Sequence, residues 1–344
     1  MHKSLLFKDY EKNLMLGLFL NLYKKDVSDL PYFFNLNKFM NLCVTNKISL
    51  LCLNKIQDFD HAVDNDLMAQ YNIIKEKIEK RKQSRFNSIK ALNDILDDGY
   101  LLIKTFRGGI SLGHDLDIYV PDLIYAVNKL KKYGFHSLSS VNYDKHKYSL
   151  IKPGYMELDI HDRVSWGSLR FIDEEEILWN NLRVVSMDGL SCQIPGIEGD
   201  ILTNLAHINF QTYSLCLGDL KYVSSLLPKA NMNILLNETS KFHWKAAFIE
   251  TLSKINSVNM ILKTMRNYHD LFDINDNLTF PLLLSADHVA RALKQKGVLN
   301  LIKLISYYSL SPYIPLRLKS AFSYVVIHKL AKIHIQYGLG KMSY

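Results

Sequence analysis

The spacing of apolar residues changes twice along the chain of 344 residues. Up to about residue 97, and again after about residue 173, apolar side chains recur at the three- and four-residue spacing of helices. Between these regions, short β-prone runs alternate with turns that contain glycine or proline. This pattern predicts an α+β protein, with a helical N-terminal region (1–97), a small mixed β-sheet core (98–172) and a helical C-terminal domain (173–344).

The first part of the predicted core has the pattern of strand, turn, strand and helix. Residues 100–106 form an apolar run that enters a turn at Gly108-Gly109, and residues 116–120 form a second short strand. Asp122 then begins a helix, because an aspartate at this position accepts a hydrogen bond from the N–H groups of the first helical turn. The segment therefore predicts two neighbouring strands with a helix after them.

Two more strands are predicted at residues 147–151 and 156–161. The dipeptide Pro153-Gly154 lies between them and is typical of a tight turn, so we expect a β-hairpin. Apolar and polar side chains alternate along the second strand, which places them on opposite faces of the sheet. The polar face would carry Glu157, Asp159 and His161.

Two aspartates, Asp115 and Asp117, are the strongest candidates for chemistry. They lie two residues apart at a predicted strand, so both carboxylates project from the same face. Carboxylates held so close repel each other unless a cation lies between them, and Mg²⁺ prefers such oxygen ligands. Asp159 on the predicted hairpin would add a third carboxylate and complete a site for two ions about 3.5–4 Å apart. The alternative is that these acids lie on the surface at strand ends.

Spacing alone does not single out this pair. Two other Asp-x-Asp pairs, Asp58/Asp60 and Asp64/Asp66, lie in a polar stretch of the helical region, where turn formation or solvation explains them. The surroundings of Asp115 and Asp117 differ, because strands and a glycine turn flank the pair. The sequence therefore favours these two as the metal ligands.

Gly108 and Gly109 allow the backbone to turn sharply and to approach a ligand closely. Free N–H groups in such a turn bind phosphate oxygens. Arg107 and Ser111 would add a guanidinium and a hydroxyl to the same loop. The alternative is a tight turn with no ligand.

The run from Phe106 to Val120, which reads FRGGISLGHDLDIYV, resembles the core motif of the DNA polymerase β-like nucleotidyltransferase superfamily. More narrowly, the chain resembles a little-characterised prokaryotic family labelled nucleotidyltransferase, whose acidic strand corresponds to Leu158–His161. The motif covers about residues 100–162, and the flanking helical regions agree only in pattern. One departure is the spacer between Gly109 and Asp115, which is only five residues long.

The resemblance implies an enzyme that moves a nucleoside monophosphate from an NTP to a hydroxyl of RNA, protein or a small molecule. It implies two Mg²⁺ ions bound by Asp115, Asp117 and Asp159, with Asp159 also helping to activate the attacking hydroxyl. The NTP, ATP among the possibilities, would contact the loop residues Arg107, Gly108, Gly109 and Ser111. The short spacer puts the geometry of triphosphate binding in doubt more than it does metal binding.

The net charge of +8 favours an anionic partner such as a nucleotide or RNA. It also supports a second hypothesis, a non-catalytic or toxin-like module that binds nucleic acid through the basic segment 75–90 and a C-terminal face with Arg317, Lys319, Lys329 and Lys332. His161 and His207 are interpreted as structural residues. The sequence does not indicate the oligomeric state or the acceptor.

The four cysteines lack the pairing of a zinc site or a disulfide framework, which favours free thiols in a reducing compartment. No apolar run approaches the about 20 residues that a membrane span requires. The first residues lack the core of a signal peptide. We therefore expect a cytoplasmic protein with no membrane span, although residues 320–336 are basic and amphipathic enough for a membrane-surface role.

Overall fold

The computed structural model describes most of the first 264 residues and a short strand after them. The described residues are 14–15, 35–57, 65–104, 112–138, 146–166, 169–212, 214–264 and 282–283. Arg107, Gly108, Gly109 and Ser111, the predicted nucleotide-binding residues, lie outside them. So do the basic residues after 317 and the segment 320–336.

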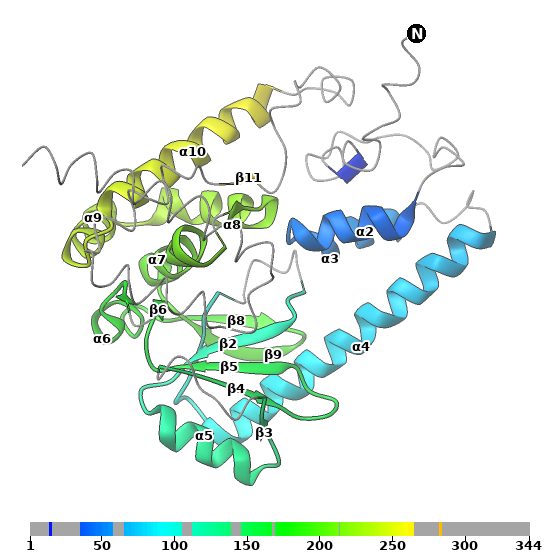
Figure 1. Ribbon diagram of the computed structural model, residues 1–344, viewed down its shortest axis with the longest axis horizontal. Coiled ribbons are helices and arrows are strands. Elements are labelled where there is room, and N and C mark those ends of the chain that lie inside the picture. The colour runs from blue at the N-terminus through cyan, green and yellow to red at the C-terminus, as the bar shows by residue number, and fades with distance from the viewer. Residues whose placement is uncertain are drawn as a thin grey trace, which may run out of the picture.

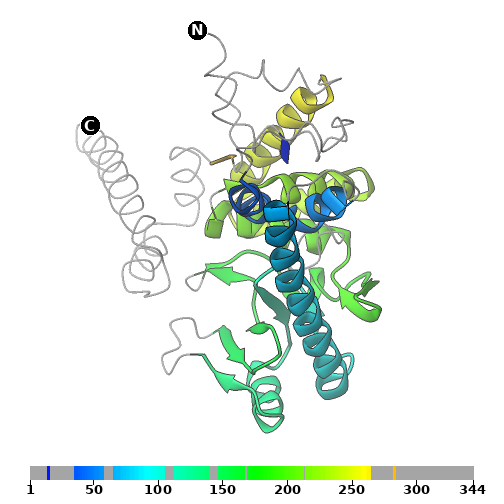
Figure 2. The same cartoon turned by 90° about the vertical axis from the view of Figure 1, so that its right-hand side faces the viewer.

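Helices form the N-terminal region, as predicted: α2 (Leu36–Thr45), α3 (Ser49–Gln57) and α4 (Asn65–Leu96). The side chain of Asn35 caps α2 by accepting a hydrogen bond from the Lys38 N–H. Helix α4 has 32 residues, which corresponds to a length of about 48 Å. It runs from the N-terminal helices down one side of the molecule to the far end of the sheet (Figures 1 and 2).

A five-stranded mixed sheet follows, with the strand order β1-β2-β5-β4-β3. Its strands are β1 (Leu101–Leu102), β2 (Asp115–Tyr119), β3 (His136–Ser137), β4 (Lys147–Ile151) and β5 (Glu157–His161), and α5 (Leu123–Lys132) lies between β2 and β3. Strands β2 and β5 are parallel, whereas the other neighbours are antiparallel. The α+β fold class and the predicted β4–β5 hairpin are both confirmed.

The first strand is shorter than the predicted run 100–106. Its regular pairing with β2 covers Leu101 and Leu102, and the Ile103 N–H still donates to the Asp117 carbonyl. Lys104 then has a φ of 57°, which is the left-handed conformation and is incompatible with a continuing strand. The chain therefore leaves the sheet at Lys104.

The two faces of the sheet contact different parts of the molecule. On one face Leu116, Ile118, Leu158 and Ile160 pack with α5 and the second half of α4. On the other face Leu101, Ile103 and Tyr119 join the core of the helical regions. Because successive side chains alternate between faces, Asp115, Asp117, Glu157, Asp159 and His161 share the face of Tyr119.

The C-terminal region contains more β-structure than the predicted run of helices. A hairpin of β8 (Arg183–Met187) and β9 (Leu190–Ile194) follows the short helix α6 (Glu174–Ile177). Its turn is Asp188-Gly189, with φ of 52° and 86°, and Asp-Gly is a preferred pair for such two-residue turns. Met187, Cys192 and Ile194 pack in the same core as β2 and β5, so this hairpin extends the central unit beyond residue 172.

Helices cover the sheet on the side opposite α4 and α5 (Figure 1). They are α7 (Ile197–His207), α8 (Leu217–Leu226), α9 (Met232–Lys241) and α10 (Lys245–Thr264), with a π-helical turn at Ile208–Thr212 and a 3₁₀ turn at Leu227–Lys229. Two-residue strands pair as β6 (Ser165–Trp166) with β7 (Leu169–Arg170) and as β10 (Ser214–Leu215) with β11 (Leu282–Leu283). No helix in the described part of the chain combines the length and apolar content of a membrane span.

Candidate metal centre

Strands β2 and β5 place their acidic side chains next to one another. In the parallel register Asp117 is the direct partner of Asp159, and Asp115 is the partner of Glu157. Directly opposed residues on neighbouring strands project from the same face and lie within contact distance. Four carboxylates therefore form a row of two pairs on one face of the sheet.

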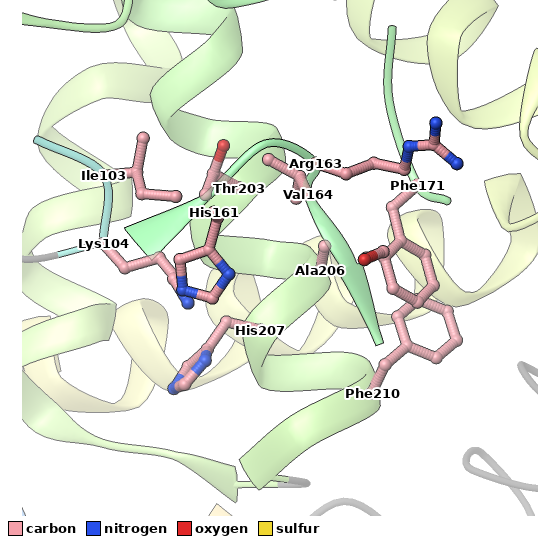
Figure 3. A pocket seen from close by; sticks show the side chains of 11 residues that line it. Ile103, Lys104, His161, Arg163, Val164, Phe171, Thr203, Ala206, His207 and Phe210 are labelled. Atoms are coloured by element: carbon pink, nitrogen blue, oxygen red, sulfur yellow. The ribbon is translucent and has the colours of Figure 1, made fainter. Parts of the chain in front are cut away.

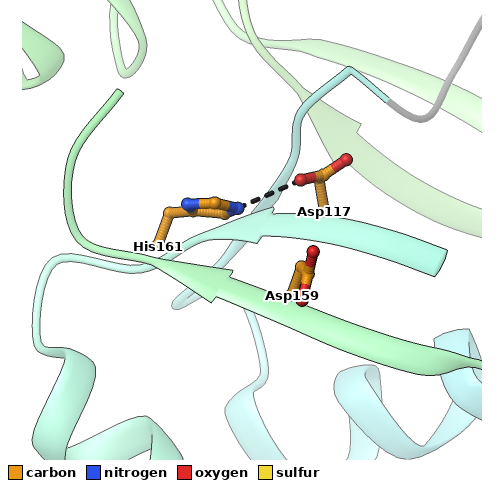
Figure 4. A group of neighbouring side chains, drawn as sticks. All are labelled: Asp117, Asp159 and His161. Atoms are coloured by element: carbon orange, nitrogen blue, oxygen red, sulfur yellow. Dashed lines mark hydrogen bonds and ion pairs between the residues drawn. The ribbon is translucent and has the colours of Figure 1, made fainter. Parts of the chain in front are cut away.

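Asp117 and Asp159 of this row form a compact group with His161, which lies on the same face (Figure 4). Each offers one ligand atom, and these atoms lie within 4.8 Å of one another. It is the one group of three or more potential metal ligands within the described ranges. Asp159 and His161 are buried, with 5% and 7% of their surface exposed, so the backbone and packing hold both in place.

The ligand set fits a divalent cation. Two carboxylate oxygens suit the hard ions Mg²⁺ and Mn²⁺, and an imidazole nitrogen adds a ligand that transition ions accept more readily than Mg²⁺ does. His161 Nε2 lies 3.0 Å from Asp117 Oδ1 and is hydrogen-bonded to it, so the two groups are close enough to share a bound ion in place of this hydrogen bond.

Two lysines compensate the buried carboxylates. Lys104 Nζ lies 2.6 Å from Asp117 Oδ1, and Lys147 forms an ion pair with Asp159. The Ser149 hydroxyl also donates to Asp159. Lys147 and Ser149 reach the site because β4 pairs with β5 and places them opposite His161 and Asp159.

The charges of the site do not cancel. Asp115, Asp117, Glu157 and Asp159 carry four negative charges when ionised, and Lys104 and Lys147 carry two positive ones, so 4 − 2 leaves two negative charges. His161 adds little positive charge, because burial and then the nearby Lys104 ammonium lower its pKa. A residual charge of −2 is the charge that one divalent cation neutralises.

The aspartates of the motif have opposite electrostatic properties. Burial, and then the charges of Asp117 and Asp159, raise the pKa of Asp115 to about 6. Burial also acts to raise the pKa of Asp117, but the Lys104 ammonium and the hydrogen bond with His161 outweigh it and hold that pKa well below its usual value. Burial, followed by Asp159 and Asp115, raises the pKa of Glu157. Asp117 is thus ionised and already paired with Lys104 and His161, whereas burial and then charge repulsion favour the protonated form of Asp115.

We compared the chain with protein-family models, with curated proteins and with solved structures. None of them matches it.

The predicted metal ligands were Asp115, Asp117 and Asp159, and the structure brings two of them into the compact group. Asp115 lies outside that group, although it is near enough to the other two for their charges to raise its pKa. His161 takes the third place, and it is also the hydrogen-bonded strand residue that the sequence indicated, because its ring contacts Asp117. The signal was present in the sequence, because His161 lies two residues after Asp159 and therefore on the same face.

The lysines of the site come from different parts of the sheet, because Lys104 follows β1 and Lys147 begins β4. Lys152 follows β4, but its ammonium donates to the Tyr133 carbonyl and lies over the Tyr155 ring, so it is engaged elsewhere. No local sequence pattern links Lys104 to Asp117, because strand pairing alone brings them together.

Helix α4 also reaches the edge of the site. The Arg81 guanidinium lies 3.0 Å from Nδ1 of His114, the residue directly before Asp115. The basic segment 75–90 therefore contacts the residue before Asp115 through Arg81.

Proposed function

We propose that this protein is a metal-dependent nucleotidyltransferase, which transfers a nucleoside monophosphate from an NTP to a hydroxyl group. The observation that carries the proposal is the pairing of Asp117 with Asp159 on adjacent parallel strands, with Asp115 two residues before Asp117 on the same face. The mixed sheet and the motif from Phe106 to Val120 agree with the resemblance to the DNA polymerase β-like superfamily.

The proposed roles in the reaction follow from the ligand types at the site. Asp117, Asp159 and His161 would hold a divalent ion. When bound, such an ion would neutralise part of the charge of the phosphates. Asp115 and Glu157 extend the acidic row on the same face, where a second ion would need ligands. Lys104 and Lys147 bring positive charge to within reach of the phosphates.

The chemical step needs positioning more than covalent catalysis. The acceptor oxygen forms a bond with the α-phosphorus, and the bond from that phosphorus to the bridging oxygen of the β-phosphate breaks. Pyrophosphate leaves, and the proton of the acceptor hydroxyl passes to a carboxylate of the site. Asp159 is the carboxylate that the resemblance assigns to this activation. Arg107, Gly108, Gly109 and Ser111 are proposed to contact the nucleotide.

A direct assay tests the proposal. The purified chain is incubated with each α-labelled NTP, with Mg²⁺ or Mn²⁺, and with total RNA or with lysate protein. We expect label to enter one acceptor fraction only when the metal is present. Asp117→Asn should abolish the incorporation, and a chain that incorporates no label from any NTP with either metal would rule the function out.

A second candidate is a nucleic-acid-binding module without catalytic activity. The ion pairs of Lys104 with Asp117 and of Lys147 with Asp159 favour it, because each buried carboxylate already has a positive partner. Calorimetry with Mn²⁺ separates the two functions. The proposed enzyme should bind Mn²⁺ at the acidic row, whereas a binding module should not. The module should instead bind RNA with the same affinity in the presence and absence of EDTA.

A further inference from the structure

A small pocket adjoins the metal centre on the side of α7. Lys104 and His161 belong to both the metal centre and the pocket lining, and Thr203, Ala206 and His207 of α7 form the opposite wall. Its volume is about 20 Å³. A cavity of this size admits one small group and not a nucleotide base or sugar.

The lining combines five apolar residues with six that carry N–H or O–H groups. The pocket's lining residues are all described, and none of them is an aspartate or a glutamate. Lys104 comes from the end of β1, Ser165 from β6 and His207 from the last position of α7, so three separate elements bring N–H and O–H donors to one place. In Figure 3 the Lys104 ammonium end, the His161 ring and the His207 ring lie on one side of the pocket, while the Arg163 guanidinium extends away from them.

Lys104 connects this pocket to the acidic row. Its ammonium is 2.6 Å from Asp117 Oδ1, and its side chain is only 10% exposed. The left-handed backbone of Lys104, with a φ of 57°, is uncommon for a residue with a side chain and directs the lysine into this position. A group bound in the pocket would therefore lie beside the cation that Asp117 binds.

We propose that the pocket is a binding site for a phosphate group, with Lys104, Ser165 and His207 as its hydrogen-bond donors. Its size and its lack of carboxylates select a compact anion, and charge-assisted hydrogen bonds from lysine suit phosphate oxygens. The further assignment of this phosphate to the diphosphate part of an NTP rests on the proposed function. In that case α7 takes part in substrate binding, and His207 is a substrate-binding residue and not a structural one.

Titration calorimetry with inorganic pyrophosphate tests the pocket. The titration is done at one saturating Mg²⁺ concentration for every variant, because without a divalent ion the acidic row keeps two negative charges that repel pyrophosphate. His207→Ala should weaken the affinity about tenfold, as the loss of one hydrogen bond to a charged group does, and Ser165→Ala should weaken it less. Arg163→Ala is the comparison variant, because Arg163 also lines the pocket but its guanidinium extends away from Lys104, His161 and His207, and the substitution should change the affinity less than twofold.

Thermal melting of each variant checks that the fold is intact. Where His207→Ala lowers the melting temperature, His207→Gln replaces it, because glutamine keeps a similar volume and an N–H donor and should retain part of the affinity. Equal losses of pyrophosphate affinity in His207→Ala and Arg163→Ala would show that only net charge matters, and would overturn the proposed phosphate site. Absence of any pyrophosphate binding by the unmodified chain would overturn it as well.

The pocket and the proposed function fail in different ways. If the chain transfers nucleotides but His207→Ala does not change its pyrophosphate affinity, the phosphate site is wrong and the proposed function still holds. If His207→Ala weakens pyrophosphate binding but the chain transfers no nucleotide, the phosphate site is supported and the proposed function is wrong.

Discussion

Lys104 Nζ lies 2.6 Å from Asp117 Oδ1, at the position where a metal ion would meet the same oxygen. The lysine is held there by a left-handed backbone at the point where the chain leaves β1. The ammonium therefore acts as a resident cation for Asp117 and competes with any divalent ion that binds the acidic row. We therefore expect the positive charge of Lys104 to lower the affinity of the site for a metal ion.

Replacing Lys104 should have opposite effects on metal binding and on stability. Lys104→Met keeps the apolar stem and removes the ammonium, so Mn²⁺ should bind about tenfold more tightly. Without metal, Asp117 loses a buried partner, and the free energy of unfolding should fall by about 2–4 kcal/mol. Calorimetry with Mn²⁺ and urea unfolding in EDTA measure the two effects. Weaker Mn²⁺ binding in Lys104→Met would show that the lysine supports the metal and does not compete with it.

Asp115 should make stability depend on pH in a defined window. Its folded pKa of about 6 lies above the ordinary value of 3.8, so ionisation destabilises the folded state. The cost is absent below about pH 4 and is fully present above about pH 6, where it reaches at most about 3 kcal/mol at 1.36 kcal/mol per pKa unit. Asp115→Asn should therefore be more stable than the unmodified chain at pH 8 and equal to it near pH 4. Urea unfolding in EDTA at both pH values measures this, and an equal difference at both would exclude the mechanism.

The acidic residues should separate into those that serve catalysis and those that do not. Asp117→Asn and Asp159→Asn each remove a negative ligand, so nucleotide incorporation should fall by more than about a hundredfold. Asp58→Ala and Asp64→Ala, from the other Asp-x-Asp pairs, should leave incorporation within twofold. The four variants are compared in one incorporation assay, with melting temperatures alongside. If the two control variants lose as much activity as the other two, the site has been assigned to the wrong residues.

His161 should determine which metal ion the site prefers. Its imidazole is a better ligand for Mn²⁺ than for Mg²⁺, so His161→Asn should weaken Mn²⁺ binding about tenfold and change Mg²⁺ binding less than threefold. The comparison is made by calorimetry with each ion. His146→Asn is the matched control, because His146 is also buried beside an aspartate, Asp162, but lies outside the metal-ligand group. Similar losses for both ions would mean that His161 only orients Asp117.

Local features of the fold could be predicted from the sequence. The Pro153-Gly154 turn and the alternation after it predicted the β4–β5 hairpin, and Asp122 caps α5 by accepting from the Tyr125 N–H. Each of these features depends on residues within a few positions of one another. The Asp188-Gly189 pair is also typical of a hairpin turn and could have indicated β8 and β9. The hairpin was missed because the region after residue 173 was interpreted as helical throughout.

The site depends on contacts between distant residues, and these had no local signal. The parallel pairing of β2 with β5 joins segments about forty residues apart. The approach of Asp159 to Asp117 was therefore predicted from the chemistry of a metal site and from the resemblance, and not from a local pattern. The same pairing places His161 beside Asp117, whereas the β4–β5 pairing brings Lys147 to Asp159.

The contact between Arg85 of α4 and Asp188 of the β8–β9 turn should be a major source of stability. Two hydrogen bonds, of 2.6 and 2.8 Å, join the guanidinium to both carboxylate oxygens, and the Arg85 side chain is 7% exposed. Removing one partner leaves a largely buried charge, so Arg85→Ala and Asp188→Ala should each lower the free energy of unfolding by about 2–4 kcal/mol. The double variant should cost less than the sum, because it leaves no charge unpaired. Urea unfolding of the four proteins measures this difference, and strictly additive losses would mean that the pair contributes packing alone. Lys80→Ala, at an exposed ion pair with Glu76, is the control and should change stability by less than about 0.5 kcal/mol.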